Sequence, residues 1–108
     1  MKQHQELIQT LAACAAACQH CSDQCLDEEN VKNMAECIRT DRDCADACHM
    51  AINFIARQSP YAREVVDMCQ KLCKTCGDTC SQHDMEHCQA CAEACRSCEQ
   101  ACQQFLAA

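Results

Sequence analysis

The sequence predicts an all-α protein, an antiparallel up-down-up-down four-helix bundle that occupies residues 1–108 as a single domain. Three observations predict this fold. Sixteen of the 108 residues are cysteines that follow one another mainly at steps of three and four, and such steps keep side chains on one side of an α-helix. The chain has one glycine and one proline, too few for the many turns of a β protein. The residues between the cysteines include many strong helix formers, and the length is typical of one domain.

The cysteines fall into four groups, and each group predicts the inward stripe of one helix. Leucine or isoleucine normally occupies this stripe, so a core made of thiols is expected. The groups are Cys14, Cys18, Cys21 and Cys25; Cys37, Cys44 and Cys48; Cys69, Cys73, Cys76 and Cys80; and Cys88, Cys91, Cys95, Cys98 and Cys102.

The first two helices are expected over Gln3–Asp27 and from Asn30 to Arg57. Asn30 is a residue type that caps helix N-termini. The acidic run Asp27-Glu28-Glu29 between them is interpreted as a solvated turn. The short connection makes the two helices antiparallel neighbours.

The third helix is expected to open with Ser59 as its N-cap and Pro60 as its first residue, and to run to Gln82. Gly77 is interpreted as an interior glycine that allows close approach of a neighbour. Asp84 is expected to cap the fourth helix, which runs to Phe105.

Threading the chain through this topology predicts layers of inward side chains. Asp41 falls where a cysteine would be expected, and its carboxyl group is predicted to accept hydrogen bonds from neighbouring thiols or from Arg39 or Arg42. The predicted layers are Cys14, Cys48, Cys69 and Cys102; Cys18, Cys44, Cys73 and Cys98; Cys21, Cys76 and Cys95 with Asp41; and Cys25, Cys37, Cys80 and Cys91, with Cys88 beyond.

The two ends of the predicted bundle differ. One end carries large apolar residues, here called the apolar plug: Leu7, Leu11, Ile52, Ile55, Val65, Val66 and Phe105. The other end, here called the mouth, carries potential metal ligands: Met34, His83, His87 and Cys88. His4, His20 and His49 are predicted to lie on the surface, and Met50 and Met68 to serve packing or subunit contact.

Composition excludes several classes of function. The formal net charge is −7 and no basic patch appears, which argues against nucleic-acid binding. No apolar run is long enough to span a membrane. Leu11-Ala12-Ala13-Cys14 is similar to a lipoprotein cleavage site, but polar residues interrupt the preceding stretch, so no signal peptide and a reducing cytosol are expected.

A disulfide scaffold is disfavoured by the spacing, because a bridge between neighbouring turns of one helix would be strained. Bridges between helices remain geometrically possible. Simple packing is also disfavoured, because sixteen small side chains fill a core poorly. The sequence therefore predicts metal ions in the interior.

Charge favours Cu(I) among the metals. Each Cu(I) that displaces one thiol proton leaves the buried charge unchanged, and thiolates are the soft ligands that select Cu(I). Four tetrathiolate zinc sites would exchange sixteen protons for four divalent ions, and the excess negative charge inside would be costly. A zinc-binding structural module nevertheless stays an alternative.

An iron–sulfur electron-transfer protein is the other alternative. The closest match to a ferredoxin motif is the C-x2-C-x3-C-x2-C spacing from Cys88 to Cys98, which lacks the proline that follows the bacterial ferredoxin motif. This match is weak.

Two stretches carry a family resemblance, CIRTDRDCADAC at 37–48 and HDMEHCQAC at 83–91. With the cysteine pattern of nearly the whole chain, they resemble the cytosolic branch of the bacterial copper storage proteins. The resemblance implies a cytoplasmic homotetramer that stores several Cu(I) ions per chain and catalyses no reaction. It also implies that all sixteen cysteines are ligands, with His83 and His87 as further ligands near the open end. Met34 is a candidate rim residue that could guide Cu(I), or could instead fill a gap in the core.

Overall fold

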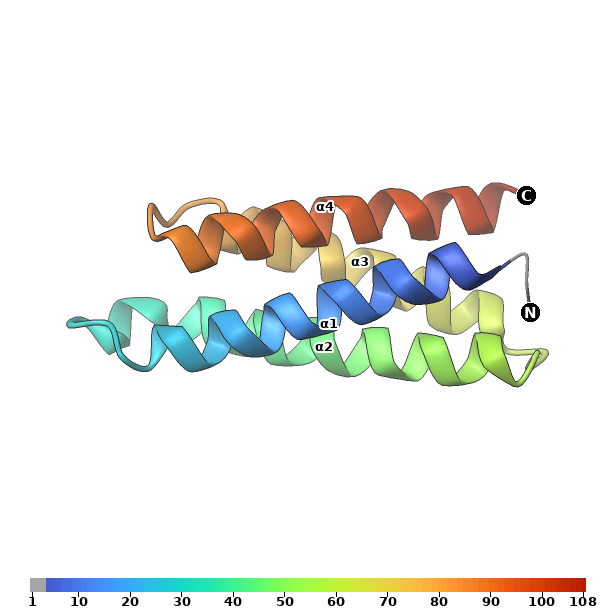
Figure 1. Cartoon of the computed structure of the whole chain (residues 1–108), viewed down its shortest axis with the longest axis horizontal. Helices are drawn as coiled ribbons and strands as arrows, with labels where there is room; N and C mark the ends of the chain where they lie inside the picture. The colour runs from blue at the N-terminus through green and yellow to red at the C-terminus, as the bar shows by residue number, and fades with distance from the viewer. Residues whose placement is uncertain (1–3) are drawn as a thin grey trace.

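The computed structural model describes residues 4–108 and consists of four long helices and one short one (Figure 1). The long helices are α1 (Gln5–Cys25), α2 (Ala35–Ala56), α3 (Ala62–Cys80) and α4 (Glu86–Ala107), and the 3₁₀ helix η2 (Val31–Met34) precedes α2. Consecutive long helices run in opposite directions, and each packs against two others, so that α4 closes the ring against α1. The predicted antiparallel four-helix bundle is confirmed. It measures 44 × 19 × 18 Å.

The connection between α1 and α2 is longer than predicted. Helix α2 begins at Ala35 rather than Asn30, because the chain first winds as η2, where the Asn33 N–H donates to the Asn30 carbonyl at 3.1 Å. Helix α1 ends at Cys25, and the next two N–H groups donate to carbonyls three residues earlier in turn geometry. Its predicted first residue, Gln3, lies outside the described residues.

Helix α2 ends in a Schellman motif. Gln58 has a positive φ of 54°, its N–H donates to the Ile55 carbonyl at 3.0 Å, and the Ser59 N–H donates to the Phe54 carbonyl at 2.9 Å. These two bonds satisfy carbonyl groups that the helix end leaves open. The left-handed residue turns the chain toward α3.

Helix α3 begins two residues later than predicted, and helix α4 begins one residue later. Helix α3 begins at Ala62, and the Ser59 hydroxyl instead accepts the Tyr61 N–H at 3.1 Å in the preceding turn. Helix α4 begins at Glu86 after an extended Met85, so Asp84 is not its cap. In both places the residue with capping chemistry lies in the connection.

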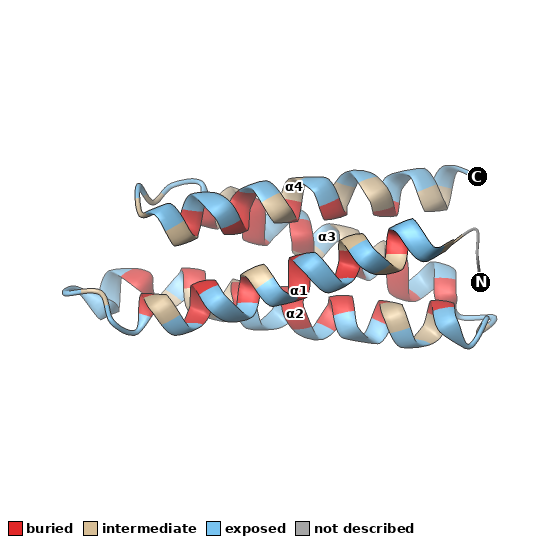
Figure 2. Cartoon of the chain, viewed as in Figure 1, coloured by how far each residue is buried: buried red, intermediate tan, exposed pale blue. Residues whose placement is uncertain are grey.

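The core is a column of thiols closed at one end by apolar side chains. All sixteen cysteines are fully buried, and buried residues follow the inner side of each helix in Figure 2. In the apolar plug, Leu7, Leu11, Ile55, Val65 and Val66 are buried, whereas Ile52 and Phe105 are partly buried. The predicted inward stripes and the plug are confirmed.

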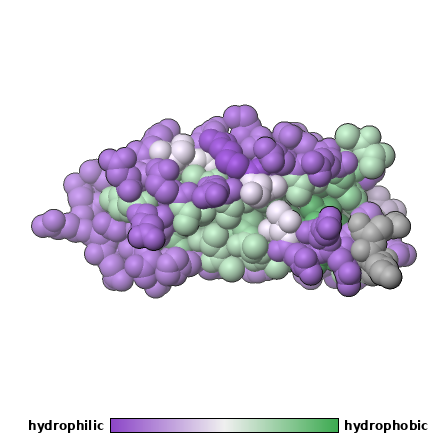
Figure 3. Space-filling model, turned by 45° about the horizontal axis from the view of Figure 1, so that its top comes forward, coloured by the Kyte–Doolittle hydropathy of each residue, from purple (hydrophilic) through white to green (hydrophobic). Residues whose placement is uncertain are grey.

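The outer surface is mostly polar, and on the face drawn in Figure 3 hydrophilic residues surround a more hydrophobic strip along the long axis. His20 and His49 are exposed as predicted, and His4 is half-buried with its ring edge-on to Phe105. Met50 and Met68 are exposed. None of the helices within residues 4–108 combines the length and the apolar character needed to cross a membrane.

Gly77 lies where α4 comes close to α3. A Cβ atom at this position would lie 3.0 Å from Nη1 of Arg96, and the Arg96 guanidinium pairs with Asp78 at 2.7 Å. The predicted close approach is therefore confirmed, and the neighbour is a side chain of α4.

Candidate metal site

The candidate site is the sulfur column, the set of sixteen cysteine Sγ atoms along the bundle axis. All sixteen cysteines are free thiols, so none of the residues 4–108 forms a disulfide. Sulfurs on different helices approach closely, from 3.1 Å between Cys37 and Cys80 to 4.0 Å between Cys18 and Cys76. Such distances are far longer than a disulfide bond. Within residues 4–108 the structure therefore does not contain the disulfide bridges between helices that the sequence left possible.

The predicted register is correct between α2 and α3. Cys48 lies 3.8 Å from Cys69, Cys44 lies 3.4 Å from Cys73, and Asp41 lies 3.2 Å from Cys76, in each case measured between side-chain sulfur or oxygen atoms. These pairs are the ones that the layers predicted.

The predicted register is only partly correct for α1 and α4, since Cys14 lies within 4.8 Å of Cys48 as predicted but lies closer to Cys44. The Cys14 sulfur lies 3.8 Å from Cys44 and 3.9 Å from Cys95, whereas the prediction placed Cys14 with Cys48, Cys69 and Cys102. In the same way Cys98 lies 3.9 Å from Cys48 rather than beside Cys44. Each of these helices is displaced by up to about one turn.

The connections explain this displacement. In an antiparallel pair, residues at equal distances from the middle of the connection face each other. In its last layer the prediction paired Cys25 with Cys37 and Cys80 with Cys91. In the structure Cys21, and not Cys25, lies opposite Cys37, with their sulfurs 3.9 Å apart.

The column divides into overlapping groups of four sulfurs, each with its atoms within 4.8 Å of one another. Neighbouring groups share members, so an ion could pass from one group to the next by exchanging one ligand at a time. Four of the groups are Cys48, Cys69, Cys73 and Cys98; Cys14, Cys44, Cys48 and Cys73; Cys14, Cys18, Cys44 and Cys95; and Cys18, Cys76, Cys91 and Cys95.

Among residues 4–108, Asp41 is the one buried residue whose side chain can carry a charge by acid–base titration, cysteines apart. Its Oδ1 accepts hydrogen bonds from the thiols of Cys91 at 3.1 Å, Cys76 at 3.2 Å and Cys80 at 3.4 Å. Arg39 and Arg42 are exposed, so the predicted thiol partners are the ones present. Burial, together with the charge interactions of Cys91 and Cys76, raises the pKa of Asp41 to about 12. The carboxyl group is therefore protonated near neutral pH.

At the mouth, Cys21, Cys25, Cys88 and His87 form a further group within 4.8 Å, here called the mouth group. Nδ1 of His87 lies 3.4 Å from the Cys21 sulfur and 3.5 Å from the Cys88 sulfur. Nε2 of His87 lies 2.8 Å from Oε2 of Glu28. The structure thus brings two of the predicted mouth residues, His87 and Cys88, together with two cysteines of α1.

The thiols of the mouth group differ in acidity. Hydrogen bonds with Cys37 and Cys80 lower the pKa of Cys21 to about 5, whereas burial raises the pKa of Cys25 and of Cys88. For His87, burial lowers the pKa but the hydrogen bonds with Cys21 and Glu28 outweigh it, and the net pKa is raised. Cys21 is therefore the thiol of this group that gives up its proton most readily to a metal.

The other two predicted mouth residues line an open hollow of about 550 Å³ beside this group. Met34 is buried in its wall and His83 is half-buried. Glu28 and Met85 also line it, and the sequence analysis missed both. Glu28 was assigned to a solvated turn, but its contact with His87 joins residues far apart in sequence, and no local spacing signals such a contact.

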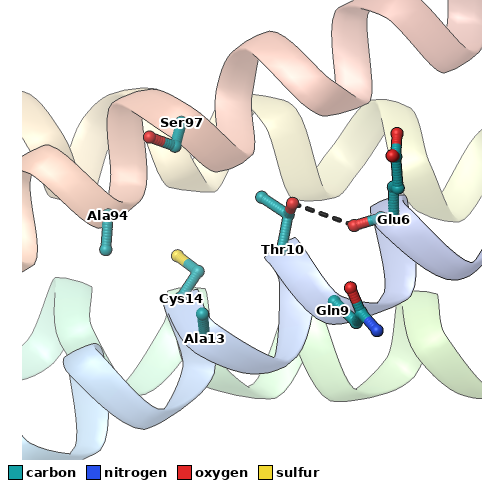
Figure 4. Close-up of a pocket in the computed structure, with 7 residues that line it drawn as sticks. All are labelled: Glu6, Gln9, Thr10, Ala13, Cys14, Ala94 and Ser97. Carbon is teal, nitrogen blue, oxygen red and sulfur yellow. Dashed lines mark hydrogen bonds between the residues drawn. The ribbon is translucent and has the colours of Figure 1, made fainter.

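A second hollow, of about 490 Å³, lies on the side of the bundle between α1 and α4 (Figure 4). Cys14 and Ala13 of α1 face Ala94 and Ser97 of α4 there, and the Thr10 hydroxyl donates to the Glu6 carbonyl at 2.9 Å. Cys14 has no exposed surface. Small side chains therefore cover the sulfur column along this seam.

Comparison with known proteins gives a consistent result. The sequence model described as Csp, copper storage protein, matches residues 1–107. The cysteine-rich protein YhjQ of Bacillus subtilis (strain 168) is 41% identical over 93 residues, which make up 85% of this chain and 86% of that protein.

Solved structures are equally similar. Cu(I)-bound BsCsp3, a Bacillus copper storage protein, has a TM-score of 0.92 and 38% identity, and the match covers 95% of this chain and 97% of that one. A cytosolic copper storage protein from Streptomyces lividans, solved with five coppers, has a TM-score of 0.91 and 46% identity over 94% of this chain and 90% of that one. The copper storage protein Ccsp from Streptomyces lividans has also been solved loaded with 10 copper equivalents.

Proposed function

The chain belongs to the copper storage protein family, and we propose that it binds, sequesters and stores several Cu(I) ions on its sulfur column. The single observation that carries this proposal is the set of sixteen fully buried thiols in overlapping groups along one axis. The relatives with solved Cu(I)-bound and copper-loaded structures share this fold.

Buried charge supports Cu(I) over zinc. Within residues 4–108 no lysine or arginine is buried, so nothing inside the column would offset excess thiolate charge. A Cu(I) ion that replaces one proton adds no charge to the interior, whereas a tetrathiolate zinc site leaves two excess negative charges. An uncompensated buried charge costs several kcal/mol. Cu(I) is also the softer partner for thiolate sulfur.

The proposed ligands are all sixteen cysteines, with His87 as a further ligand in the mouth group. His83 and Met34, in the wall of the adjoining hollow, are proposed to guide ions toward that group. Asp41 is proposed to tune its neighbours by hydrogen bonding without binding copper, since a carboxyl group suits Cu(I) poorly.

Uptake is proposed to begin at the mouth. The lowered pKa of Cys21 makes a thiolate available there, and the apolar plug closes the opposite end. From the mouth group ions would pass inward through the contact of Cys21 with Cys37, and then by ligand exchange between groups that share cysteines.

The chain is proposed to act without catalysis, in the cytoplasm, as a single domain that assembles into a homotetramer. Copper ions are its proposed partners, and we propose that it binds neither nucleic acid nor membranes. The mass of the purified protein by light scattering tests the tetramer, and a monomer would contradict it.

Anaerobic titration with Cu(I) in the presence of a competing chelator tests the proposed function. Storage predicts uptake of many ions per chain, and saturation at one or two ions would reject it. The iron–sulfur alternative predicts a brown protein that contains acid-labile sulfide. The zinc alternative predicts about four zinc ions and unfolding on chelation.

A further inference from the structure

We propose that Glu28 is a positioning residue that fixes the orientation of His87, so that Nδ1 is the nitrogen offered to Cu(I) in the mouth group. This inference rests on the proposed copper-binding function and assigns a role to a residue outside the set of ligands.

The geometry places the His87 ring between two different environments. On one side Nε2 lies 2.8 Å from Oε2 of Glu28, and on the other Nδ1 lies 3.4 Å and 3.5 Å from the sulfurs of Cys21 and Cys88. The side chains are 11% exposed for His87 and 29% exposed for Glu28. The ring is therefore enclosed, and its contacts are not those of a solvated surface histidine.

The chemistry of these contacts assigns the ring hydrogen. A carboxylate only accepts hydrogen bonds, so Nε2 must carry a hydrogen to bond with Glu28. In a neutral imidazole the other nitrogen then has a free lone pair. That lone pair points toward Cys21 and Cys88, where a Cu(I) ion bound to their sulfurs would lie. A histidine that binds metal commonly donates its other N–H to a carboxylate, which orients the ring and increases its basicity.

Local structure holds Glu28 in place. The Glu28 N–H donates to the Cys25 carbonyl at 3.2 Å, and the Asp27 N–H donates to the Gln24 carbonyl at 3.0 Å. Glu28 therefore lies in a turn that continues directly from the last cysteine of α1. The same turn positions one ligand of the mouth group, Cys25, and the carboxylate that orients another.

A competing explanation is that Glu28 only attracts cations to the mouth by its charge. Glu29 provides a matched control, because it is the adjacent acidic residue, it lines the same hollow and its side chain is exposed. Attraction by charge predicts similar effects of Glu28→Ala and Glu29→Ala. Positioning predicts an effect of Glu28→Ala alone.

The first experiment is 15N NMR of the histidine rings in full-length protein, without copper and after stepwise addition of Cu(I). In the wild-type protein and in Glu29→Ala, we expect the His87 Nε2 signal to remain that of a protonated nitrogen, while the Nδ1 signal shifts on copper binding. In Glu28→Ala, we expect the Nε2 signal to shift because its acceptor is lost, and the fraction of rings protonated at Nε2 to fall. An unchanged His87 spectrum in Glu28→Ala would overturn the proposal.

The second experiment is a double-mutant cycle in which a Cu(I) chelator competes with the mouth group. Glu28→Ala is expected to weaken binding of the ions held there by about tenfold to 100-fold, and Glu29→Ala to leave it unchanged. Glu28→Gln keeps an acceptor for Nε2–H and is expected to retain most of the affinity. In a His87→Ala background, Glu28→Ala is expected to have no further effect. A full additional loss in that background would overturn the proposal, since Glu28 would then act independently of His87.

The two proposals fail in different ways. If wild-type protein takes up only one or two Cu(I) ions, the storage function fails. If wild-type protein takes up many ions but Glu28→Ala and Glu29→Ala behave alike, only the role of Glu28 fails.

Discussion

Asp41 places one carboxyl group within the sulfur column, at the level of Cys76 and Cys91. A charged carboxylate there would be costly without a buried cation, and burial instead keeps the group protonated by raising its pKa to about 12. Its acceptor oxygens then satisfy thiol donors in the metal-free protein. When copper replaces those thiol protons, Asp41 loses these donors.

The raised pKa makes the stability of the metal-free protein depend on pH. The folded chain retains a proton on Asp41 that the unfolded chain loses above its ordinary pKa of 3.8. The contribution of the Asp41 proton to the unfolding free energy is therefore complete below pH 3.8 and declines as the pH rises above it. Between about pH 5 and pH 8 the unfolding free energy should therefore fall as the pH rises, and we expect this fall to be smaller in Asp41→Asn by up to about 1.4 kcal/mol per pH unit.

Chemical denaturation of both proteins under reducing conditions checks this prediction. The cysteines titrate in both proteins, so the difference between the two slopes isolates Asp41. Parallel slopes would show that the Asp41 carboxyl group is not held protonated.

His87 provides a second test at the residue scale. His87→Ala is expected to slow Cu(I) uptake with little change in total capacity, because it removes one ligand at the mouth and leaves all sixteen thiols. Stopped-flow uptake from a Cu(I) chelate measures the rate, and His49→Ala, an exposed histidine on α2, serves as the control. Unchanged kinetics in His87→Ala would count against uptake through the mouth.

Among the helices, α1 shows which features the sequence could predict. Steps of three and four between cysteines predicted each helix and its buried face, because this periodicity is local. The displacement of α1 and α4 by up to about one turn was not predictable from the same spacing, since the stripe looks alike at every turn. Register depends on the connections between helices. The short helix η2 was not predicted, because Asn30 is a residue type that caps helices and therefore predicted the start of the second helix there. The contact of Glu28 with His87 also depends on tertiary packing, and no local pattern indicates it.

The apolar plug should carry much of the stability of the metal-free bundle, because thiols contribute little bulk. Leu11 on α1 is fully buried, and Leu11→Ala is expected to lower the unfolding free energy by about 2–4 kcal/mol without reducing copper capacity. Leu26 is 50% exposed, so Leu26→Ala should have a much smaller effect in the same denaturation experiment. Equal effects would contradict the assignment of the plug.

For the whole molecule, folding and copper binding are expected to be separable. The metal-free protein has a column of buried thiols, an apolar plug and complete helices, so it should remain helical without metal. Copper bound between helices should then stabilise the fold, because a ligand that binds only the folded state raises its stability. Circular dichroism is expected to show a helical metal-free protein whose melting temperature rises with each addition of Cu(I). Loss of helicity on removal of metal would instead favour a zinc-dependent structural module.

The most direct test of the central claim is to count ions and protons together. Native mass spectrometry and pH-metric titration of one anaerobic sample give the number of Cu(I) ions bound and the protons released per ion. If buried thiols exchange protons for monovalent ions without adding charge, binding should approach one ion per cysteine, with about one proton released for each ion. Saturation after one or two ions, or release of several protons per ion, would contradict the account.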